Sequence, residues 1–372
     1  MAGVYIHIPF CKSKCGYCDF YSCTSTDLRE RVSEAILREL ELRRGFMPGD
    51  EVETIYVGGG TPSLLAPEQL QRFIDKVKEL WNCSHLEEVT VELNPDDLSA
   101  DYIKRLVATD VDRLSIGIQS FIDRDLEFMG RRHNARKGEA AVGLAQAAGF
   151  DNISIDLIYG IPGMSLEEWR RNLERAVGLG VQHLSAYHLT IEDNTPFGRR
   201  GVAPADEDAS REQFLLLHDI TGAAGMEHYE ISNFALPGRR AKHNSGYWDG
   251  RHYLGVGPSA HSFNGRERSW STADVEKYLN GIEAASLDLY HTEVLTPADR
   301  YNEYVMTSLR RSQGADLRDI KRIFGERQAG FFLENAMRLQ AKGLLDREGE
   351  RFFINYENFL ISDEIISSLF MG

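Results

Sequence analysis

Six short β-rich segments alternate with helical segments through the first half of the chain, and this alternation constrains the fold most strongly. We expect strands at Val4–Ile8, Glu53–Val57, Glu88–Leu93, Arg113–Ile118, Asn152–Ile158 and His183–Leu189. We expect helices between them at Asp27–Arg44, Pro67–Leu80, Ala100–Ala108, Arg136–Ala148 and Leu166–Val177. Such alternation predicts parallel β/α units. Because six units are fewer than the eight of a closed barrel, we predict an α/β fold with an open, partial (β/α)6 TIM-like barrel.

The rest of the chain follows other patterns from about Ala203 onward. A helix is expected at Arg211–Ala224 and a strand at Glu227–Ile231, whereas residues 233–272 show no clear periodicity. Three more helices are expected at Pro297–Arg311, Leu317–Phe324 and Glu334–Lys342, followed by a hairpin over Leu344–Ile354. We therefore predict a barrel over residues 1–232, a connecting segment over 233–295, and a small winged-helix-like α+β domain over 296–372 for packing or protein contact. Thr26 or Asp27 is the expected N-cap of the first helix.

Three of the five cysteines lie together on one short loop. Cys11, Cys15 and Cys18 have the spacing C-x3-C-x2-C, which chance placement of five cysteines in 372 residues does not explain. An iron–sulfur cluster usually takes four cysteine ligands, so three would leave one iron open to an exogenous ligand. A structural zinc site closed by His7 and a disulfide are the alternatives.

Polar residues and glycines follow several of the predicted strands. The run Gly58–Pro62 comes after the second strand, and its glycines would let a ligand approach the backbone closely. Glu92, Gln119 and Asp156 lie at or near the ends of three later strands. The mouth of a parallel barrel collects such residues, although each alone also fits a surface or capping position.

The charge and the N-terminus restrict the partners and the compartment. A formal net charge of −15 disfavours binding to nucleic acid or to an anionic membrane. The segment Met1–Phe10 lacks the charged start and the longer apolar core of a signal peptide, and no apolar run has the length of a membrane span. We expect a cytoplasmic protein that meets a membrane only through a partner.

The motifs together resemble those of the radical S-adenosylmethionine (SAM) enzymes, and more narrowly those of the oxygen-independent coproporphyrinogen III oxidase-like family. The resemblance covers nearly the whole chain and rests on Tyr5–Cys11, the cysteine loop with Asp19 and Phe20, Gly58–Pro62 and Asp156–Gly163. It implies that Cys11, Cys15 and Cys18 hold a [4Fe–4S] cluster and that SAM occupies the open iron. The same resemblance implies SAM contacts from Tyr5, Tyr17, Gly59, Gly60, Thr61, Glu92, Gln119, Arg131 and Asp156. The chemistry would be that of the cofactor, whose sulfonium is split to a 5′-deoxyadenosyl radical.

One position near the cluster motif separates branches of this family. The oxidases carry a further cysteine two residues after the third ligand and an extension ahead of the cluster. Here that position is Phe20, and Cys11 comes early in the chain. Cys23 does not fit the oxidase motif, so we interpret Cys23, like Cys83, as a free thiol.

A second motif, His243–Trp248, resembles the H-N-x-x-Y-W motif of the haem chaperone family HemW. A neutral imidazole is a suitable axial ligand for haem iron. The cations Arg239, Arg240 and Lys242 stand just before it and could pair with haem propionates. A histidine that is only hydrogen-bonded and a solvated basic turn fit the same residues. His261 is a second candidate ligand.

The resemblance therefore predicts a haem chaperone that binds haem, carries a cluster and SAM, and passes haem to an acceptor protein, with an electron donor protein as a further partner. Three alternatives stay open. They are an oxygen-independent coproporphyrinogen III oxidase that forms protoporphyrinogen IX by oxidative decarboxylation, a radical SAM enzyme acting on another tetrapyrrole, and a zinc-stapled scaffold without catalysis.

Overall fold

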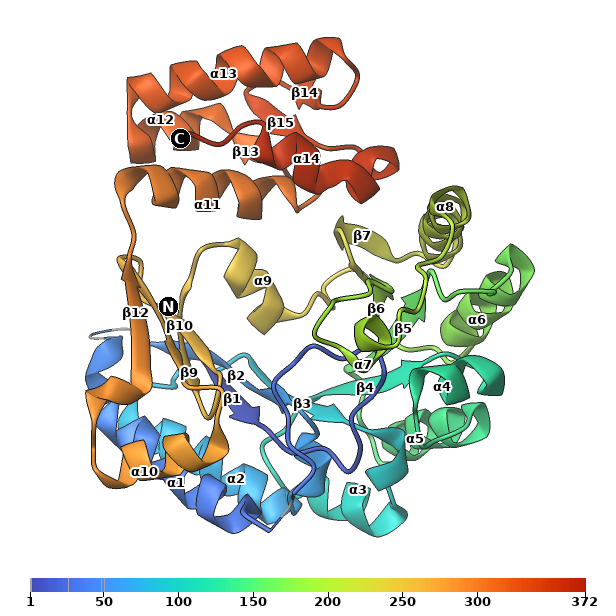
Figure 1. Cartoon of the computed structure of the whole chain (residues 1–372), viewed down its shortest axis with the longest axis vertical. Coiled ribbons are helices and arrows are strands. Elements are labelled where there is room, and N and C mark those ends of the chain that lie inside the picture. Colours follow the sequence, from blue (N-terminus) through green and yellow to red (C-terminus); the bar gives the residue numbers. More distant parts are fainter. Residues whose placement is uncertain (1, 26, 48, 50) are drawn as a thin grey trace.

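Six parallel strands, adjacent in chain order, form the central sheet of this computed structural model, which describes residues 2–25, 27–47, 49 and 51–372 (Figure 1). The strands are β1 (Ala2–Ile8), β2 (Val52–Gly59), β3 (Glu88–Leu93), β4 (Arg113–Gln119), β5 (Ile153–Tyr159) and β6 (His183–His188). The helices on the outer side are α1 (Arg29–Leu42), α2 (Pro67–Leu80), α3 (Ala100–Leu106), α4 (Asp123–Met129), α5 (Ala135–Ala147) and α6 (Leu166–Gly178). Apolar side chains of β1, such as Val4 and Ile6, are fully buried. The predicted α/β partial barrel is confirmed.

The sheet continues past these six strands at both edges, which the sequence did not predict. Beside β1 lie β9 (His252–Val256), β10 (His261–Phe263), β11 (Glu267–Ser271) and β12 (Tyr290–Val294), and beside β6 lie β8 (Asn233–Ala235) and β7 (Glu227–Glu230). Of these added strands, β7 corresponds to the strand expected at Glu227–Ile231, whereas the others are three to five residues long and show too few alternations to be recognised in the sequence. The sheet therefore crosses the predicted boundary between residues 232 and 233, and the division into three regions stays a prediction.

The remaining helices connect the barrel to a C-terminal unit, which Figure 1 shows in orange and red above the barrel. The connecting part contains α7 (Pro196–Arg199), α8 (Glu207–Ala223), α9 (Lys242–Trp248) and α10 (Val275–Glu283). The C-terminal unit contains α11 (Pro297–Leu309), β13 (Ala315–Asp316), α12 (Leu317–Phe324), α13 (Glu326–Ala341), β14 (Asp346–Glu348), β15 (Arg351–Phe353) and α14 (Ser362–Ser367). The expected hairpin is present and turns at Gly349.

Two local expectations about helix starts were wrong or lie outside the described residues. Asp27 does not cap α1, because Leu28 occupies the N-cap position and makes no side-chain cap hydrogen bond. Thr26, the other expected cap, lies outside the described residues. The helix expected at Glu334 begins eight residues earlier, at Glu326. None of the helices within the described ranges combines the length and the apolar character that crossing a bilayer requires.

A buried carboxylate on α1 fixes the added strands against the barrel. Glu39 is fully buried and accepts hydrogen bonds from the Tyr278 hydroxyl at 2.7 Å, the Tyr290 hydroxyl at 2.8 Å and the Gly257 amide at 2.7 Å. All three donors belong to the connecting segment. Burial raises the pKa of the Glu39 carboxyl, and the hydrogen bonds and the nearby Arg43 partly offset that shift.

Replacing Glu39 by alanine is expected to lower the free energy of unfolding by about 3 kcal/mol, because the change leaves buried donors without an acceptor. Urea denaturation followed by circular dichroism measures this loss. The matched control is Glu34→Ala on the exposed face of the same helix, where a surface ion pair with Arg72 is lost and little change is expected. Equal unfolding midpoints for the two variants would contradict this role of Glu39.

Candidate functional site

A cavity of about 600 Å³ opens at the carboxyl ends of the barrel strands. Its lining unites the cysteine loop, the glycine run after β2 and the polar residues that follow β3, β4 and β5. The predicted residues among those that line it are Cys11, Cys15, Cys18, Tyr17, Gly59, Gly60, Thr61, Glu92, Gln119, Arg131 and Asp156. Predicted residues up to 145 positions apart in the sequence therefore meet in one site. Of the residues predicted to contact the cluster or SAM, Tyr5 does not line the cavity, and neither does His243, the predicted haem ligand.

The cysteine thiols contact polar groups on other walls of the cavity. The Thr61 hydroxyl donates to Cys11 Sγ at 3.4 Å, and Arg131 Nη1 donates to Cys15 Sγ at 3.7 Å. All five cysteines are free thiols, so the disulfide alternative is wrong for this structure. Burial raises the pKa of the Cys11 thiol and raises that of Cys18 to about 11. Because the thiolate is the form that binds metal, iron binding would have to displace these protons.

The donor set fits an iron–sulfur cluster better than a single zinc ion. No three His, Cys, Asp or Glu side chains in the described ranges are arranged to hold one metal ion. His7, the proposed fourth zinc ligand, is bonded at both ring nitrogens, to the Tyr5 hydroxyl at 3.0 Å and to the Tyr21 carbonyl at 3.1 Å. A cubane cluster binds each cysteine through a different iron, so its ligand sulfurs lie farther apart than those around one zinc.

The glycine run approaches the cysteine loop so closely that side chains are excluded. The Gly60 amide donates to the Ile8 carbonyl at 2.8 Å, and a Cβ at Gly60 would lie 2.7 Å from the Phe10 carbonyl oxygen. Gly59 has a φ of 107°, and a Cβ there would lie 2.6 Å from the His7 ring. Only glycine fits these positions, and the exposed backbone can lie directly against a ligand.

Two half-buried carboxyl groups, on β3 and β5, line the cavity. Glu92 accepts hydrogen bonds from the Tyr56 hydroxyl at 2.7 Å and from the Gly59 amide at 2.9 Å. Burial raises the pKa of Glu92 to about 7. Burial likewise raises the pKa of Asp156 to about 6, and the Ser115 hydroxyl lies 3.4 Å from its carboxylate. Each carboxylate oxygen has a second lone pair, so both groups can still accept from a ligand.

The half-buried side chain of Arg131 also lines the cavity. Arg131 donates from Nη2 to the Gly117 carbonyl at 2.7 Å, while its buried Nε has no hydrogen-bond partner within the described ranges. Gln119 nearby adopts a φ of 70°, which is unusual for a residue with a side chain. An unpartnered guanidinium N–H beside the thiols is suited to an anionic ligand group, such as a carboxylate.

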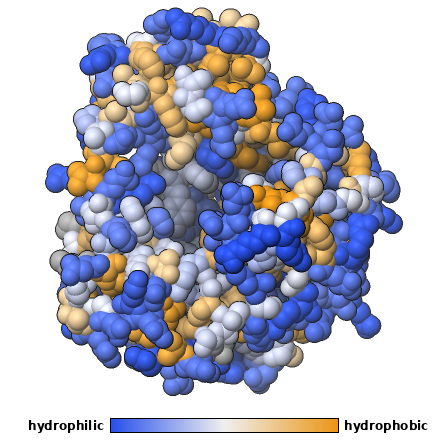
Figure 2. Space-filling model, in the orientation of Figure 1, coloured by the Kyte–Doolittle hydropathy of each residue, from blue (hydrophilic) through white to orange (hydrophobic). Residues whose placement is uncertain are grey.

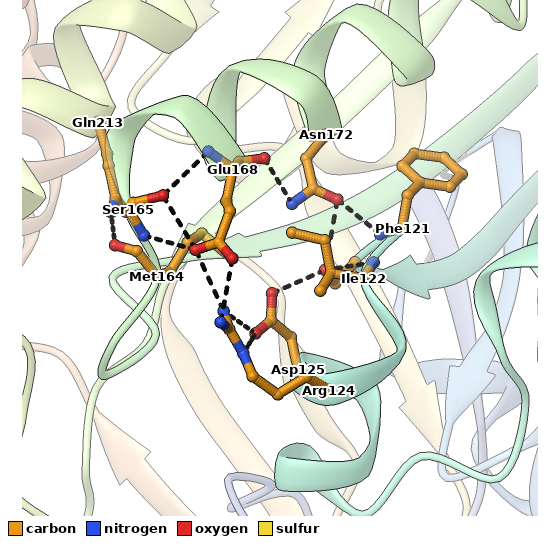
Figure 3. A network of polar contacts seen from close by, with 10 residues as sticks. Phe121, Ile122, Arg124, Asp125, Met164, Ser165, Glu168, Asn172 and Gln213 are labelled. Carbon is orange, nitrogen blue, oxygen red and sulfur yellow. Dashed lines mark hydrogen bonds and ion pairs between the residues drawn. The ribbon is translucent and has the colours of Figure 1, made fainter.

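A polar network behind the cavity fixes the segments that follow β4 and β5 (Figure 3). Asn172 of α6 accepts from the Phe121 amide at 2.5 Å, and Glu168 pairs with Arg124 at 3.0 Å. Gln213 of α8 donates to the Met164 carbonyl at 3.1 Å. These contacts hold the loops that follow Gln119 and Asp156, and their residues do not line the cavity. The spacing of residues in the sequence does not predict these contacts.

His243 lies in the stretch for which the sequence predicted no regular element, but the structure places it on the short helix α9, where its side chain is buried. Its Nδ1 is hydrogen-bonded to the Thr54 hydroxyl at 2.8 Å, and its Nε2 is hydrogen-bonded to the Tyr247 hydroxyl at 2.9 Å. The ring also stacks on Tyr56, with 5.1 Å between centroids. Burial lowers the pKa of His243 to about 3, so the imidazole is neutral. Ligation of haem iron by His243 would require one of its hydrogen bonds to break.

The basic residues before His243 are already paired with surface carboxylates. Arg239 lies 3.2 Å from Asp151, and Lys242 lies 3.1 Å from Glu87. Arg240 pairs with Glu227 at 2.8 Å. Exposed pairs of this kind are weak, so they could exchange for a ligand's carboxylates.

Two further predicted positions are exposed. Phe20, which stands where the oxidase pattern has a cysteine, lines the edge of the cavity with 67% of its surface exposed. His261 is exposed and stacks on Trp270. Cys23 lies outside the cavity lining and donates to the Ser25 carbonyl at 3.6 Å.

Comparison with known proteins agrees with this geometry. The family description "Radical SAM superfamily" matches residues 5–176, and "HemN C-terminal domain" matches residues 295–357. A solved structure of coproporphyrinogen III oxidase (HemN) from Escherichia coli superposes with a TM-score of 0.86, covering 100% of this chain and 90% of that chain. Its sequence identity is 21%, so it shows the fold alone.

Several curated relatives align along most of the chain. "Heme chaperone HemW" of Mycobacterium tuberculosis is 35% identical over 99% of this chain and 94% of its own length. The protein of that name from Bacillus subtilis is 33% identical over the whole of both chains, and that from Escherichia coli is 38% identical over 69% of each. The chain therefore belongs to the HemW family of the radical SAM superfamily.

Proposed function

We propose that the protein is a haem chaperone that carries a [4Fe–4S] cluster and SAM in its barrel, binds haem and transfers it to an acceptor protein. The observation that carries the proposal is the cavity, in which three free thiols meet a glycine turn and two half-buried acids. At its edge stands the exposed Phe20 in place of a fourth cysteine. The relatives named as haem chaperones support the haem part of the proposal.

The residues present fit the proposed cofactors. Cys11, Cys15 and Cys18 would hold the cluster, and the cluster with SAM would supply an electron and a source of the 5′-deoxyadenosyl radical. Around them the chain's own groups orient the ligand. The backbone of Gly59 and Gly60 leaves room for it, and Arg131 offers an unpartnered N–H to an anionic group.

The two half-buried acids would bind the ribose of SAM. Glu92 and Asp156 can accept hydrogen bonds from ribose hydroxyls, because each has lone pairs left after its contacts within the protein. Thr61 and Tyr17 line the same cavity beside the thiols, where they limit access of water. An electron donor protein and a cytoplasmic location remain part of this proposal.

Titration of the purified protein with haem, followed by the absorbance of bound haem, tests the chaperone function. We expect saturable binding at micromolar haem, and its absence would overturn the proposal. The H-N-x-x-Y-W motif predicts His243 as the haem ligand, so the titration includes the variant His243→Ala. Both ring nitrogens of His243 are hydrogen-bonded within the protein. Unchanged haem binding by this variant would show that another residue ligates the iron and would not contradict the chaperone function.

The alternative is oxygen-independent coproporphyrinogen III oxidation. Phe20 counts against it, and the solved oxidase shares only the fold. The test is an anaerobic assay of the reconstituted protein with coproporphyrinogen III, SAM and an electron donor. We expect no protoporphyrinogen IX, and its formation would favour the alternative.

A further inference from the structure

Three flat side chains stack in a row across the added strands β10, β11 and β12. His261 pairs across the strands with Trp270, and Trp270 pairs with His291. The centroids of neighbouring rings are 5.7 Å apart in both pairs, with interplanar angles of 17° and 25°. We call His261, Trp270 and His291 the aromatic ladder.

The ladder lies on the face of the sheet that points away from α1. Ser262 and Ser269, its neighbours along the strands, accept from Arg43 at the end of α1, at 3.1 and 2.9 Å. Because side chains alternate along a strand, His261 and Trp270 point to the opposite face. Both imidazoles are exposed while the indole is half-buried.

One end of the ladder lies near β1, the strand that leads into the cysteine loop. Gly257, at the end of β9, lies against His7 of β1, since a Cβ on it would be 2.4 Å from the His7 carbonyl oxygen. His261 follows four residues later and is near enough to affect the pKa of His7. The cysteine loop begins just after β1, at Pro9. In the view of Figure 2 the surface is hollowed at its centre, below the C-terminal unit.

We infer that the aromatic ladder is a docking site for haem, with His261 as an axial ligand of the iron. This inference rests on the proposed chaperone function and assigns the place where haem binds. The ring of an imidazole that ligates haem iron is perpendicular to the haem plane. The three ladder rings are nearly parallel to one another, so their exposed edges can together support a flat porphyrin. Neither ladder imidazole has a hydrogen-bond partner within the described ranges, whereas both nitrogens of the buried His243 are bonded.

The ladder also has a cation beside it. Arg268 lies two residues before Trp270 on the same face and pairs with Glu303 of α11 at 2.7 Å. The Arg268 side chain is partly exposed, so its guanidinium can exchange Glu303 for a haem propionate. The imidazoles lie on opposite sides of the indole, so one iron takes only one of them. We assign His261, the imidazole nearer to His7 of β1, as the ligand of the haem iron. Trp270 and His291 would support the porphyrin ring.

Haem titrations of single variants test this assignment. His261→Ala is expected to raise the dissociation constant at least tenfold and to shift the absorption maxima of bound haem, and Trp270→Leu is expected to weaken binding several-fold. The matched control is His85→Ala, which removes an exposed histidine elsewhere, and should bind as the wild type does. Metal-free protoporphyrin separates ligation from stacking, because its affinity should fall in Trp270→Leu and stay unchanged in His261→Ala.

The outcomes separate this inference from the function on which it rests. No saturable binding by the wild type would overturn the chaperone proposal and the ladder with it. If the wild type binds haem saturably and His261→Ala has the same dissociation constant and the same haem absorption spectrum, the ladder is not the haem site, while the chaperone proposal is unaffected. Loss of binding in His243→Ala, with no effect of the ladder variants, would place the ligand on α9.

Discussion

Alanine in place of Cys11, Cys15 or Cys18 is expected to remove the iron–sulfur cluster from the protein. Each thiol would bind a different iron, and two thiolates cannot hold a cubane that already lacks a fourth protein ligand. Burial raises the pKa of Cys11 and Cys18, so the thiols stay protonated unless iron replaces the protons. Iron and acid-labile sulfide, measured on protein prepared without air, should fall from about four of each per chain to nearly none.

Cys23→Ala is the matched control for these variants. Cys23 lies near the loop, since its amide donates to the Pro9 carbonyl at 2.7 Å, but its thiol lies outside the cavity lining. We expect this variant to keep its full iron and sulfide content. Stoichiometric zinc without sulfide in the wild type would refute the cluster and favour the zinc-stapled scaffold.

Glu92→Gln is expected to weaken SAM binding about 10- to 100-fold at pH 8. The carboxylate is bonded to the Gly59 amide and the Tyr56 hydroxyl, which hold it toward the cavity. Loss of a charge-assisted hydrogen bond to a ribose hydroxyl costs about 1.5–3 kcal/mol, which corresponds to that range. Isothermal titration of the anaerobically reconstituted protein with SAM measures the change.

The affinity of the wild type for SAM should also depend on pH in a definite direction. Burial raises the pKa of Glu92 to about 7, so this group gains a proton as the pH falls through 7. If the carboxylate is the binding form, the affinity should fall about tenfold between pH 8 and pH 6. Asp156, with a pKa of about 6, should extend the loss to lower pH.

Two comparisons make the pH test decisive. Glu92→Gln has no proton to gain at this position, so its affinity should change less between pH 8 and pH 6. Glu87→Gln removes an exposed carboxyl just before β3, where Glu87 pairs with Lys242, and should follow the wild-type curve. A wild-type affinity that is constant from pH 8 to pH 6 would contradict the ribose contact.

The tertiary structure changed the interpretation of His243 more than that of any other residue. In the sequence it stands within residues 233–272, which show no clear periodicity and predicted no helix there. In the structure Glu88, from β3, accepts from the backbone amides of Lys242 and His243 at 2.8 and 3.0 Å and so anchors the start of α9. That carboxylate is 154 positions away from Lys242, and no local pattern can reveal it.

The sequence by itself determined the cysteine loop, the glycine turn and the parallel strand order. The loop and the turn depend on residues that are close together in the chain, and the strand order depends on the alternation of consecutive elements. Cysteines at 11, 15 and 18 must share a loop, and a strand followed by a helix returns in parallel whatever surrounds it. Only the tertiary structure decided where the sheet ends, which histidine is buried and which is exposed, and that three rings on β10, β11 and β12 stack. These features depend on strand register and on long-range hydrogen bonds, which a single sequence does not encode locally.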